Sequence, residues 1–289
     1  MLSLVIPTLD EGLELHETLL SVFEGSATPH ETIVVDDGGT DDSCAVLRQP
    51  QWRARGVVVH RIERSGVAAA RNMGASLATK PYLVFLDAHC RVEPDWLARL
   101  QVSLHSQPAA IHAPAIRDLD NDAYGCGARL IDPALRYRWR PPLSPDRPYP
   151  LPIAPGTCLA LSRATFAQLN GFGKFRELGL EDVDFSLRAW RTGIDVLAVP
   201  TARLAHRFRP YPPYRLSSLS RGYNVARVAL VHFEGNRRDQ CLRTIIGTPR
   251  AADALVEALS SDWERQRDDL ALFSVRTIDD YFDKFGDWN

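Results

Sequence analysis

Two kinds of apolar pattern alternate along the first 90 residues of the chain. Short runs rich in β-branched residues, bounded by Pro, Asp or Gly, are typical of buried strands, and they lie at 3–7, 31–35, 56–62 and 82–86. The stretches that follow have helical spacing or an alanine-rich composition, and they lie up to Val22, near 43–47 and over 66–78. This alternation predicts an α/β fold with a mixed, mostly parallel sheet flanked by helices.

The pattern changes beyond a predicted helix at 96–104. Residues 137–152 combine arginines and aromatics with six prolines, so we expect a loop there, acting as a lid, an acceptor platform or a stiff connection. Further elements are a strand at 157–161 and helical stretches at 163–169, 182–192, 216–235 and 250–269. We expect an α/β domain over 1–210 and a C-terminal helical extension packed on it over 211–289.

Charge and composition narrow the range of functions. Lys and Arg number 34 and Asp and Glu 36, so the chain has no overall basic field and we expect no nucleic acid partner. The N-terminus lacks a signal-peptide pattern, and no run of about 18 apolar residues predicts a membrane-spanning helix. Five scattered cysteines without a C-x-x-C pair indicate reduced thiols in a cytoplasmic protein and argue against a cysteine-based zinc site. Nothing indicates the oligomeric state.

Asp87 and His89 directly follow the predicted strand at 82–86. Two such side chains beyond a strand end can converge on one divalent cation, which would bridge diphosphate oxygens and neutralise a leaving group. Taken alone, the D-x-H tripeptide favours a simpler interpretation, in which Asp87 caps the following helix and His89 packs locally.

Asp36 and Asp37 end another predicted strand and precede two glycines. A carboxylate in this position can accept hydrogen bonds from a base or a ribose, while the glycine backbone lets a ligand approach closely. An ordinary Asp-Gly turn has the same pattern, so the motif alone does not decide. Because the carboxyl ends of parallel strands meet at one edge of a sheet, we expect Asp37 and Asp87 to lie in one crevice.

Five motifs, in this order along the chain, resemble those of the family 2 glycosyltransferases of GT-A fold. They are PTLDE at 7–11, VVDDGGTD at 34–41, GVAAARN at 66–72, LDAH at 86–89 and GLED at 179–182. The resemblance covers roughly the first 210 residues. It implies a Rossmann-like GT-A domain that transfers a sugar from a nucleotide diphosphate donor, with UDP as the expected nucleotide.

Most members of that family carry D-x-D where this chain has Asp87-Ala88-His89. The D-x-H form resembles the polypeptide N-acetylgalactosaminyltransferases, which complete their metal site with a distant histidine, and 199–209 resembles the segment that supplies it. The resemblance therefore implies a metal site of Asp87, His89 and His206. Oxygen and imidazole ligands together suit Mn²⁺, with Mg²⁺ as the alternative. Without the resemblance, His206 would be interpreted as a surface or helix-end histidine.

The resemblance also implies a donor site along the strand ends. Asp37 would read the base, and the first loop would contact the nucleoside, with Asp10 standing where asparagine is more usual. The predicted donor-binding residues are Pro7, Thr8, Asp10, Glu11, Asp37, Arg64, Arg71, Asp87 and Ala88. Arginine forks near a helix start suit a diphosphate, although a structural ion pair is the alternative for Arg71. The segment after His206, at 207–214, would close over the donor or serve as a connection.

Glu181 and Asp182 begin a predicted helix, where the helix dipole alone favours carboxylates. By resemblance to the inverting members of the family, this pair is catalytic, and Asp182 takes the proton of the acceptor. The retaining N-acetylgalactosaminyltransferases carry asparagine in place of Asp182, so we expect inversion, with retention as the alternative. Asp184 and Arg188 lie one turn apart on the same helix, and we expect a surface ion pair.

The sequence thus predicts a glycosyltransferase that uses a UDP-sugar and Mn²⁺. A peptide or protein side chain is the expected acceptor, while glycans, lipids and small metabolites stay open. A sugar nucleotidyltransferase and a non-catalytic module that binds nucleotide sugars are the alternatives. The former usually opens with a Gly-rich loop ending in basic residues, which 6–11 lacks.

Overall fold

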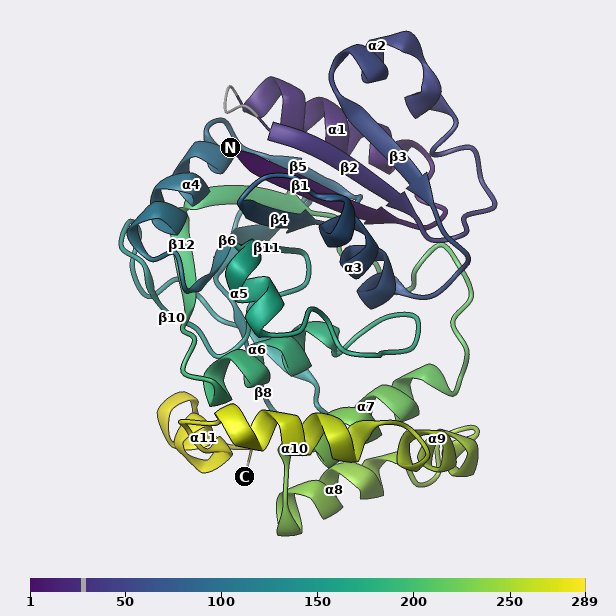
Figure 1. Cartoon of the computed structure of the whole chain (residues 1–289), viewed down its shortest axis with the longest axis vertical. Coiled ribbons are helices and arrows are strands. Elements are labelled where there is room, and N and C mark those ends of the chain that lie inside the picture. Colours follow the sequence, from purple (N-terminus) through teal and green to yellow (C-terminus); the bar gives the residue numbers. More distant parts are fainter. Residues whose placement is uncertain (27–29, 289) are drawn as a thin grey trace.

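One large mixed sheet forms the centre of the computed structural model, which describes residues 1–26 and 30–288 (Figure 1). Within these residues the strand order is β10-β12-β6-β11-β4-β1-β2-β3, with β5 paired to β12 and β7 to β6. The strands are β1 (Leu2–Thr8), β2 (His30–Asp36), β3 (Val57–Arg61), β4 (Tyr82–Leu86), β5 (Cys90–Val92), β6 (Ile111–Asp118), β7 (Tyr124–Gly125), β10 (Tyr149–Pro150), β11 (Cys158–Ser162) and β12 (Val196–His206). A separate hairpin consists of β8 (Ala128–Leu130) and β9 (Tyr137–Trp139).

The sheet has two parallel groups of strands. The strands from β3 through β2 and β1 to β4 are parallel, as are β6 and β12. Between the groups, β11 runs antiparallel to both β4 and β6. This arrangement confirms the predicted α/β fold with a mixed, mostly parallel sheet, and it brings the carboxyl ends of β1, β2 and β4 to one edge.

Helices cover both faces of the sheet. Alternate residues of β1 point to opposite faces, so Leu4 and Ile6 pack with α1 and α4, whereas Val5 packs with α3 and α6. The helices are α1 (Leu13–Gly25), α2 (Pro50–Ala54), α3 (Val67–Leu77), α4 (Trp96–Ser106), α5 (Arg163–Gln168), α6 (Glu181–Arg191), α7 (Ser220–His232), α8 (Gly235–Ile245), α9 (Ala251–Leu259), α10 (Trp263–Phe273) and α11 (Ile278–Phe285). Among the described helices, none is long and apolar enough to cross a membrane.

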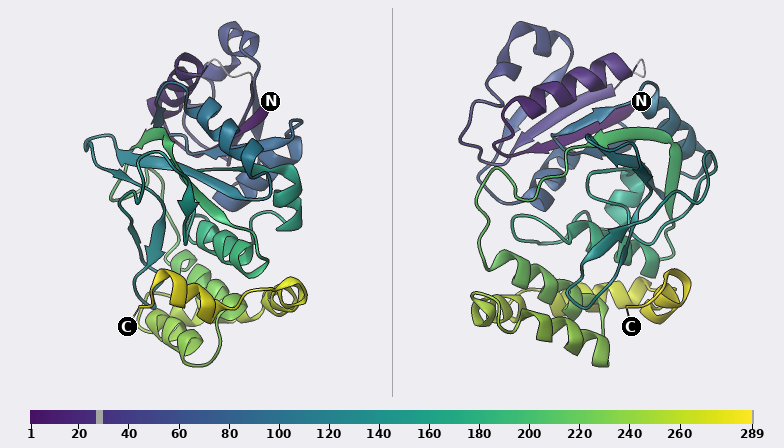
Figure 2. Two further views of the ribbon diagram at one scale, coloured as in Figure 1. Left: turned by 90° about the vertical axis from the view of Figure 1, so that its left-hand side faces the viewer. Right: turned by 180° about the vertical axis from the view of Figure 1, so that it is seen from behind.

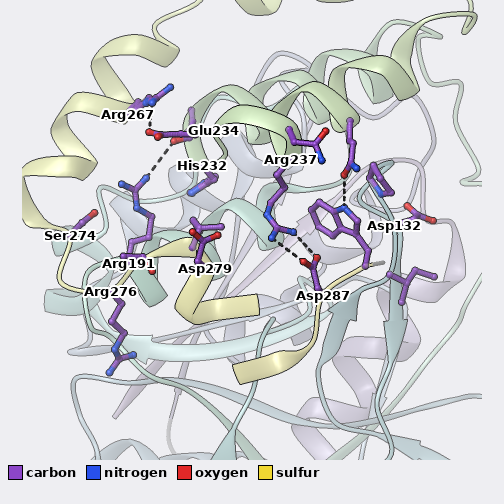
Figure 3. Close-up of a pocket in the computed structure, with 18 of the residues that line it drawn as sticks. Asp132, Arg191, His232, Glu234, Arg237, Arg267, Ser274, Arg276, Asp279 and Asp287 are labelled. Carbon is purple, nitrogen blue, oxygen red and sulfur yellow. Dashed lines mark hydrogen bonds and ion pairs between the residues drawn. The ribbon is translucent and has the colours of Figure 1, made fainter. Parts of the chain in front are cut away.

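The helices α7 to α11 form a layer below the sheet and α6, as Figures 1 and 2 show. Their buried aromatic side chains, Tyr223, Phe233 and Tyr281 among them, belong to the same apolar cluster as α6. A hollow of about 970 Å³ lies between this layer and the end of α6 (Figure 3). Its rim is charged, and Arg237 pairs there with Asp287 at 2.6 Å. Apolar packing therefore attaches the layer to α6, and at the surface Arg276 of the layer pairs with Asp195, the residue before β12, at 3.0 Å.

Several elements differ from the sequence prediction. The sequence does not predict β6 and β12, which contain Pro114 and Pro200, and proline is typical of loops. Pro200 lies where the register of β12 against β6 shifts, between Val199 and Arg203, so it interrupts no regular ladder. The predicted loop at 137–152 contains β9 and β10.

Helix boundaries also shift. The helix predicted near 43–47 is a short 3₁₀ turn at Val46–Arg48 followed by α2, which begins at Pro50 because proline is favoured at a first helical position. The helical stretch at 250–269 is two helices, α9 and α10.

Asp184 and Arg188 form a buried ion pair, so the prediction of a surface pair is wrong. Their side chains are 1% and 7% exposed, and Asp184 Oδ2 lies 2.8 Å from Arg188 Nη2. The other carboxylate oxygen of Asp184 lies 2.9 Å from His232 Nε2 on α7. Helical spacing gave the pairing correctly but could not show that α7 covers it. The three side chains join α6 to the C-terminal layer.

Asp184→Asn should destabilise the fold by about 3–5 kcal/mol, because Arg188 would keep a buried charge without its carboxylate. Burial opposes ionisation of Asp184, but Arg188 and His232 lower its pKa to about 2 in the folded chain. The stability difference between wild type and variant should therefore be full above about pH 4 and shrink as the pH falls toward 2. Urea unfolding across this range measures it.

The matched control is Asp132→Asn, which breaks the exposed pair of Asp132 with Arg136. This change should cost less than about 1 kcal/mol. Equal losses of stability in the two variants would contradict the importance of the buried pair.

Candidate active site

A cavity of about 430 Å³ opens where β1, β2 and β4 end and where α3 and α6 begin. Most of the residues predicted for the site line this cavity. They are Pro7, Thr8, Glu11, Asp37, Arg64, Arg71, Asp87, Ala88, His89, Glu181, Asp182 and His206. The strand ends and the two helix starts converge there because the β1, β2 and β4 ladders are parallel.

Asp87, His89 and His206 come together at this cavity. One ligand atom from each lies within 4.8 Å of the others, and His206 Nε2 is 3.6 Å from Asp87 Oδ2. The pairing of β12 with β5 sets this geometry, since His206 lies opposite Cys90, the residue after His89. Both nitrogens of the buried His206 ring lack a hydrogen-bond partner within the described residues. An imidazole left in this state fits a metal ligand.

The electrostatics of the group also fit a divalent cation. Burial opposes ionisation of Asp87, but His206 and the Arg71 guanidinium lower its pKa below the usual range, so the carboxylate is charged. Burial lowers the pKa of His206, which keeps its imidazole neutral near neutral pH. A charged carboxylate and a neutral imidazole are the forms that bind metal.

Arg71 is buried, with 2% of its surface exposed. Its guanidinium donates to Glu181 Oε1 at 2.8 Å, to Asp87 Oδ1 at 3.0 Å and to the Gly156 carbonyl at 2.7 Å. The structural ion pair, which was the alternative for this residue, is therefore present. Since Arg71 also lines the cavity, contact with a donor stays a prediction.

Asp37 is held by the backbone at the start of α3. Its carboxylate accepts hydrogen bonds from Ser65 N at 2.7 Å and Gly66 N at 2.9 Å, and burial raises its pKa. Gly66 is required there, because its φ is +92° and a Cβ would lie 2.8 Å from the Glu177 nitrogen. The contacts fix Asp37 at the cavity wall, and its role in reading a base stays a prediction.

Asp10 does not line the cavity, unlike its neighbours in the first loop. Its carboxylate accepts hydrogen bonds from the backbone nitrogens of Thr40 and Asp41, so it closes the glycine turn after β2. A short acidic side chain readily bonds nearby backbone N–H groups, which explains its place. No contact of Asp10 with a donor follows from this geometry.

Asp182 lies in the first turn of α6 and is 5% exposed. Its carboxylate accepts hydrogen bonds from Gly156 N and Val183 N, both at 2.9 Å. Burial raises the pKa of Asp182, and the adjacent Glu181 carboxylate raises it further. The result is an oriented carboxylate with increased proton affinity at the cavity wall.

Two charged residues at the cavity, Glu177 and Arg221, are absent from the sequence prediction. Glu177 accepts from Ser217 N and Ser220 Oγ and pairs with Arg64, so it binds the end of the segment that follows β12. Arg221 comes from α7 and donates to the Ala134 carbonyl. No local motif marks either residue, because each reaches the cavity through a contact between distant parts of the chain.

Known proteins are similar to this chain in sequence and in structure. A protein of Drosophila melanogaster, "Putative polypeptide N-acetylgalactosaminyltransferase 13", is 30% identical over 235 residues, which cover 71% of this chain and 42% of that protein. A crystal structure of GalNAc-T7 with UDP, GalNAc and Mn²⁺ has a TM-score of 0.79 and 23% identity, covering 99% of this chain and 57% of that one. The mannosyltransferase PcManGT from Pyrobaculum calidifontis, in complex with GDP-Man and Mn²⁺, has a TM-score of 0.57 and 18% identity, covering 94% and 73%.

The matches cover only part of each relative's length, and this limits what they show for this chain. The chain spans about two fifths of the length of the curated relatives it matches. The two solved structures show the shared fold alone. A sequence profile described as "Glycosyl transferase family 2" matches residues 3–169, which is 167 of 289 residues and includes four of the five motifs. The chain therefore belongs to glycosyl transferase family 2.

Proposed function

We propose that this chain transfers a sugar from a nucleotide diphosphate donor, with UDP as the nucleotide, in a metal-dependent reaction. The observation that carries the proposal is the convergence of Asp87, His89 and His206 at the edge of the sheet, where neither ring nitrogen of His206 has a hydrogen-bond partner among the described residues. Mixed oxygen and imidazole ligands favour Mn²⁺, with Mg²⁺ as the alternative. The bound cation would supply positive charge against the diphosphate leaving group.

Residues of the chain position the metal side of the cavity and the base relative to each other. Arg71 holds Asp87 through Nη2 and Glu181 through Nη1, which fixes the metal side of the cavity relative to the acid pair. Asp182 takes the proton of the acceptor as the acceptor attacks the anomeric carbon. Its raised pKa supports this role, because a base whose proton affinity is nearer neutral pH transfers protons effectively.

Inversion of configuration is the proposed outcome. A carboxylate at position 182 supports it, since a base on the acceptor side suits direct displacement. The similarity to proteins named as polypeptide N-acetylgalactosaminyltransferases favours retention as the second candidate. Product stereochemistry, read by proton NMR of the new linkage, separates the two.

A peptide or protein side chain is the proposed acceptor. The names of the relatives support it, and so do three aromatic residues of the cavity wall, Tyr137, Trp139 and Phe208. Trp139 and Phe208 pack edge to face at 5.5 Å, which gives a rigid surface of the kind that recognises peptides. The cytoplasmic location stays a prediction that rests on the reduced, buried cysteines.

Hydrolysis of a panel of nucleotide sugars, with and without Mn²⁺, tests the function. We expect slow release of nucleoside diphosphate from a preferred donor only when Mn²⁺ is present. Release of nucleoside monophosphate or of pyrophosphate would favour a nucleotidyltransferase, and no turnover would favour a binding module.

Calorimetry of UDP binding tests the metal site. His89→Ala and His206→Ala should each weaken Mn²⁺-dependent UDP binding by at least about tenfold, because each removes a ligand. His105→Ala, at the exposed end of α4, is the matched control and should bind normally. Unchanged binding in both site variants would remove the metal site from the proposal.

Asp182→Asn should slow transfer by roughly two or more orders of magnitude while leaving UDP affinity nearly intact, because the amide keeps the shape but cannot take a proton. Since the pKa of Asp182 is raised, wild-type kcat should fall as the pH drops through that pKa, and the variant should lose this dependence. Steady-state kinetics from pH 5 to 9 measures both effects. Full activity of the variant would refute the assignment of the base.

Asp37→Asn should lower the affinity for UDP about tenfold, because it removes an oriented carboxylate from the predicted base site. The affinity for inorganic pyrophosphate should change less than about twofold, since that ligand lacks the nucleoside. Asp42→Asn, exposed on the same turn, is the control. Equal losses for UDP and pyrophosphate would argue against a base-reading role.

A further inference from the structure

The two carboxylate oxygens of Glu11 contact two different parts of the cavity wall. Oε1 lies 3.1 Å from His89 Nδ1, and Oε2 accepts from Arg209 Nη1 at 2.8 Å. The residue is 8% exposed, so neither contact is an incidental surface pair. Glu11 therefore touches both a metal-site histidine and the segment that follows β12.

The first contact selects one form of the His89 ring. An ionised carboxylate only accepts hydrogen bonds, so the Nδ1 of His89 that faces it carries a proton, and in the neutral ring Nε2 then keeps its lone pair. A histidine that donates one ring N–H to a carboxylate has a fixed tautomer and orientation and is a more basic metal ligand through its other nitrogen. Glu11 thus presents Nε2 of His89 for coordination.

The second contact holds the segment 207–219, which runs from β12 to α7 along the cavity. Its beginning is attached by Arg209 to Glu11 and by Arg207 to Glu14, whose atoms Nε and Oε1 are 2.6 Å apart. Its end is attached by Ser217 to Glu177, which also accepts from Ser220 at the start of α7, and Arg64 donates to the Arg215 carbonyl at 2.6 Å. Phe208, Arg209 and Tyr214 of this segment line the cavity.

Only one of these attachments reaches the metal site. Glu14 pairs with Arg91 and Arg207 but does not line the cavity, and Glu177 contacts no member of the Asp87, His89 and His206 group. The backbone also joins the two regions, since Arg207 N donates to the His89 carbonyl at 3.0 Å. Among these side-chain attachments, that of Glu11 is the one whose other oxygen contacts the ring of a metal-site histidine, so it can make the two events depend on each other.

We propose that Glu11 is a positioning residue that couples the metal site to the segment 207–219. It orients His89 for a divalent cation through Oε1 and holds Arg209 over the cavity through Oε2. The inference rests on the metal-dependent function proposed above. Because coupling between two binding events is reciprocal, metal and nucleotide together stabilise the attached segment, and the attached segment strengthens the binding of metal and nucleotide together.

Two measurements on the full chain follow the two coupled events separately: binding of the metal and attachment of the segment 207–219. The first is Mn²⁺ affinity, from the paramagnetic resonance signal of free Mn²⁺, with and without UDP. The second is the rate of trypsin cleavage after Arg215, an exposed residue within the segment. In the wild type we expect Mn²⁺ and UDP together to slow this cleavage about tenfold or more.

Glu11→Ala should weaken Mn²⁺ binding about 10- to 100-fold and abolish the protection even at saturating Mn²⁺ and UDP. If the alanine variant is unstable, Glu11→Gln replaces it. Its amide oxygen can still accept from His89, so Mn²⁺ affinity should fall less while protection from trypsin is still lost.

Arg209→Gln should keep Mn²⁺ affinity without UDP within about threefold of the wild type and lose the protection from trypsin. Glu14→Gln is the matched control, breaking an ion pair to the same segment while leaving Mn²⁺ affinity unchanged.

Wild-type Mn²⁺ affinity in Glu11→Ala, or wild-type protection in Arg209→Gln, would overturn the inference while leaving the proposed function in place. A loss of Mn²⁺ affinity in Glu14→Gln equal to that in Glu11→Ala would overturn it too, because a general loss of charge would then explain the effect. If the wild-type chain itself showed no Mn²⁺-dependent UDP binding, the proposed function would fail together with this inference.

Discussion

The buried guanidinium of Arg71 ties the two sides of the site together. Arg71 extends from α3 between Asp87, which follows β4, and Glu181, at the start of α6. A charge removed from water this completely is stable only when its partners are in place. The same side chain therefore sets the position of a metal-site residue and of the helix that carries Asp182, so the two sides cannot shift independently.

What could be predicted from the sequence is what lies close to a strand end. Asp37, Asp87 and His89 directly follow apolar runs, and a parallel sheet brings such ends to one edge. Those residues could be placed together before any tertiary contact was known. Pro7 and Thr8 follow the same logic, since they end β1 beside β2 and β4.

Other positions depend on contacts that no local pattern contains. His206 joins the site through the register of β12 against β5. Because Pro200 makes β12 look like a loop in the sequence, only resemblance to a family pointed to His206. Asp10 lies in a predicted loop, yet its carboxylate turns to the backbone of Thr40 instead of the cavity. The burial of Asp184 likewise depends on a helix about 40 residues further along the chain.

The network of Asp184, Arg188 and His232 has a consequence for how the chain can be divided. Asp184 and Asp182 share the first turn of α6, and one of the partners of Asp184, His232, belongs to α7. Cutting the chain near 210 would expose this helix and remove the His232 contact from the buried Asp184–Arg188 pair, next to the carboxylate proposed as the base. The C-terminal helices are thus an integral wall of the catalytic unit, and a shorter enzyme of this kind would need some other scaffold against α6.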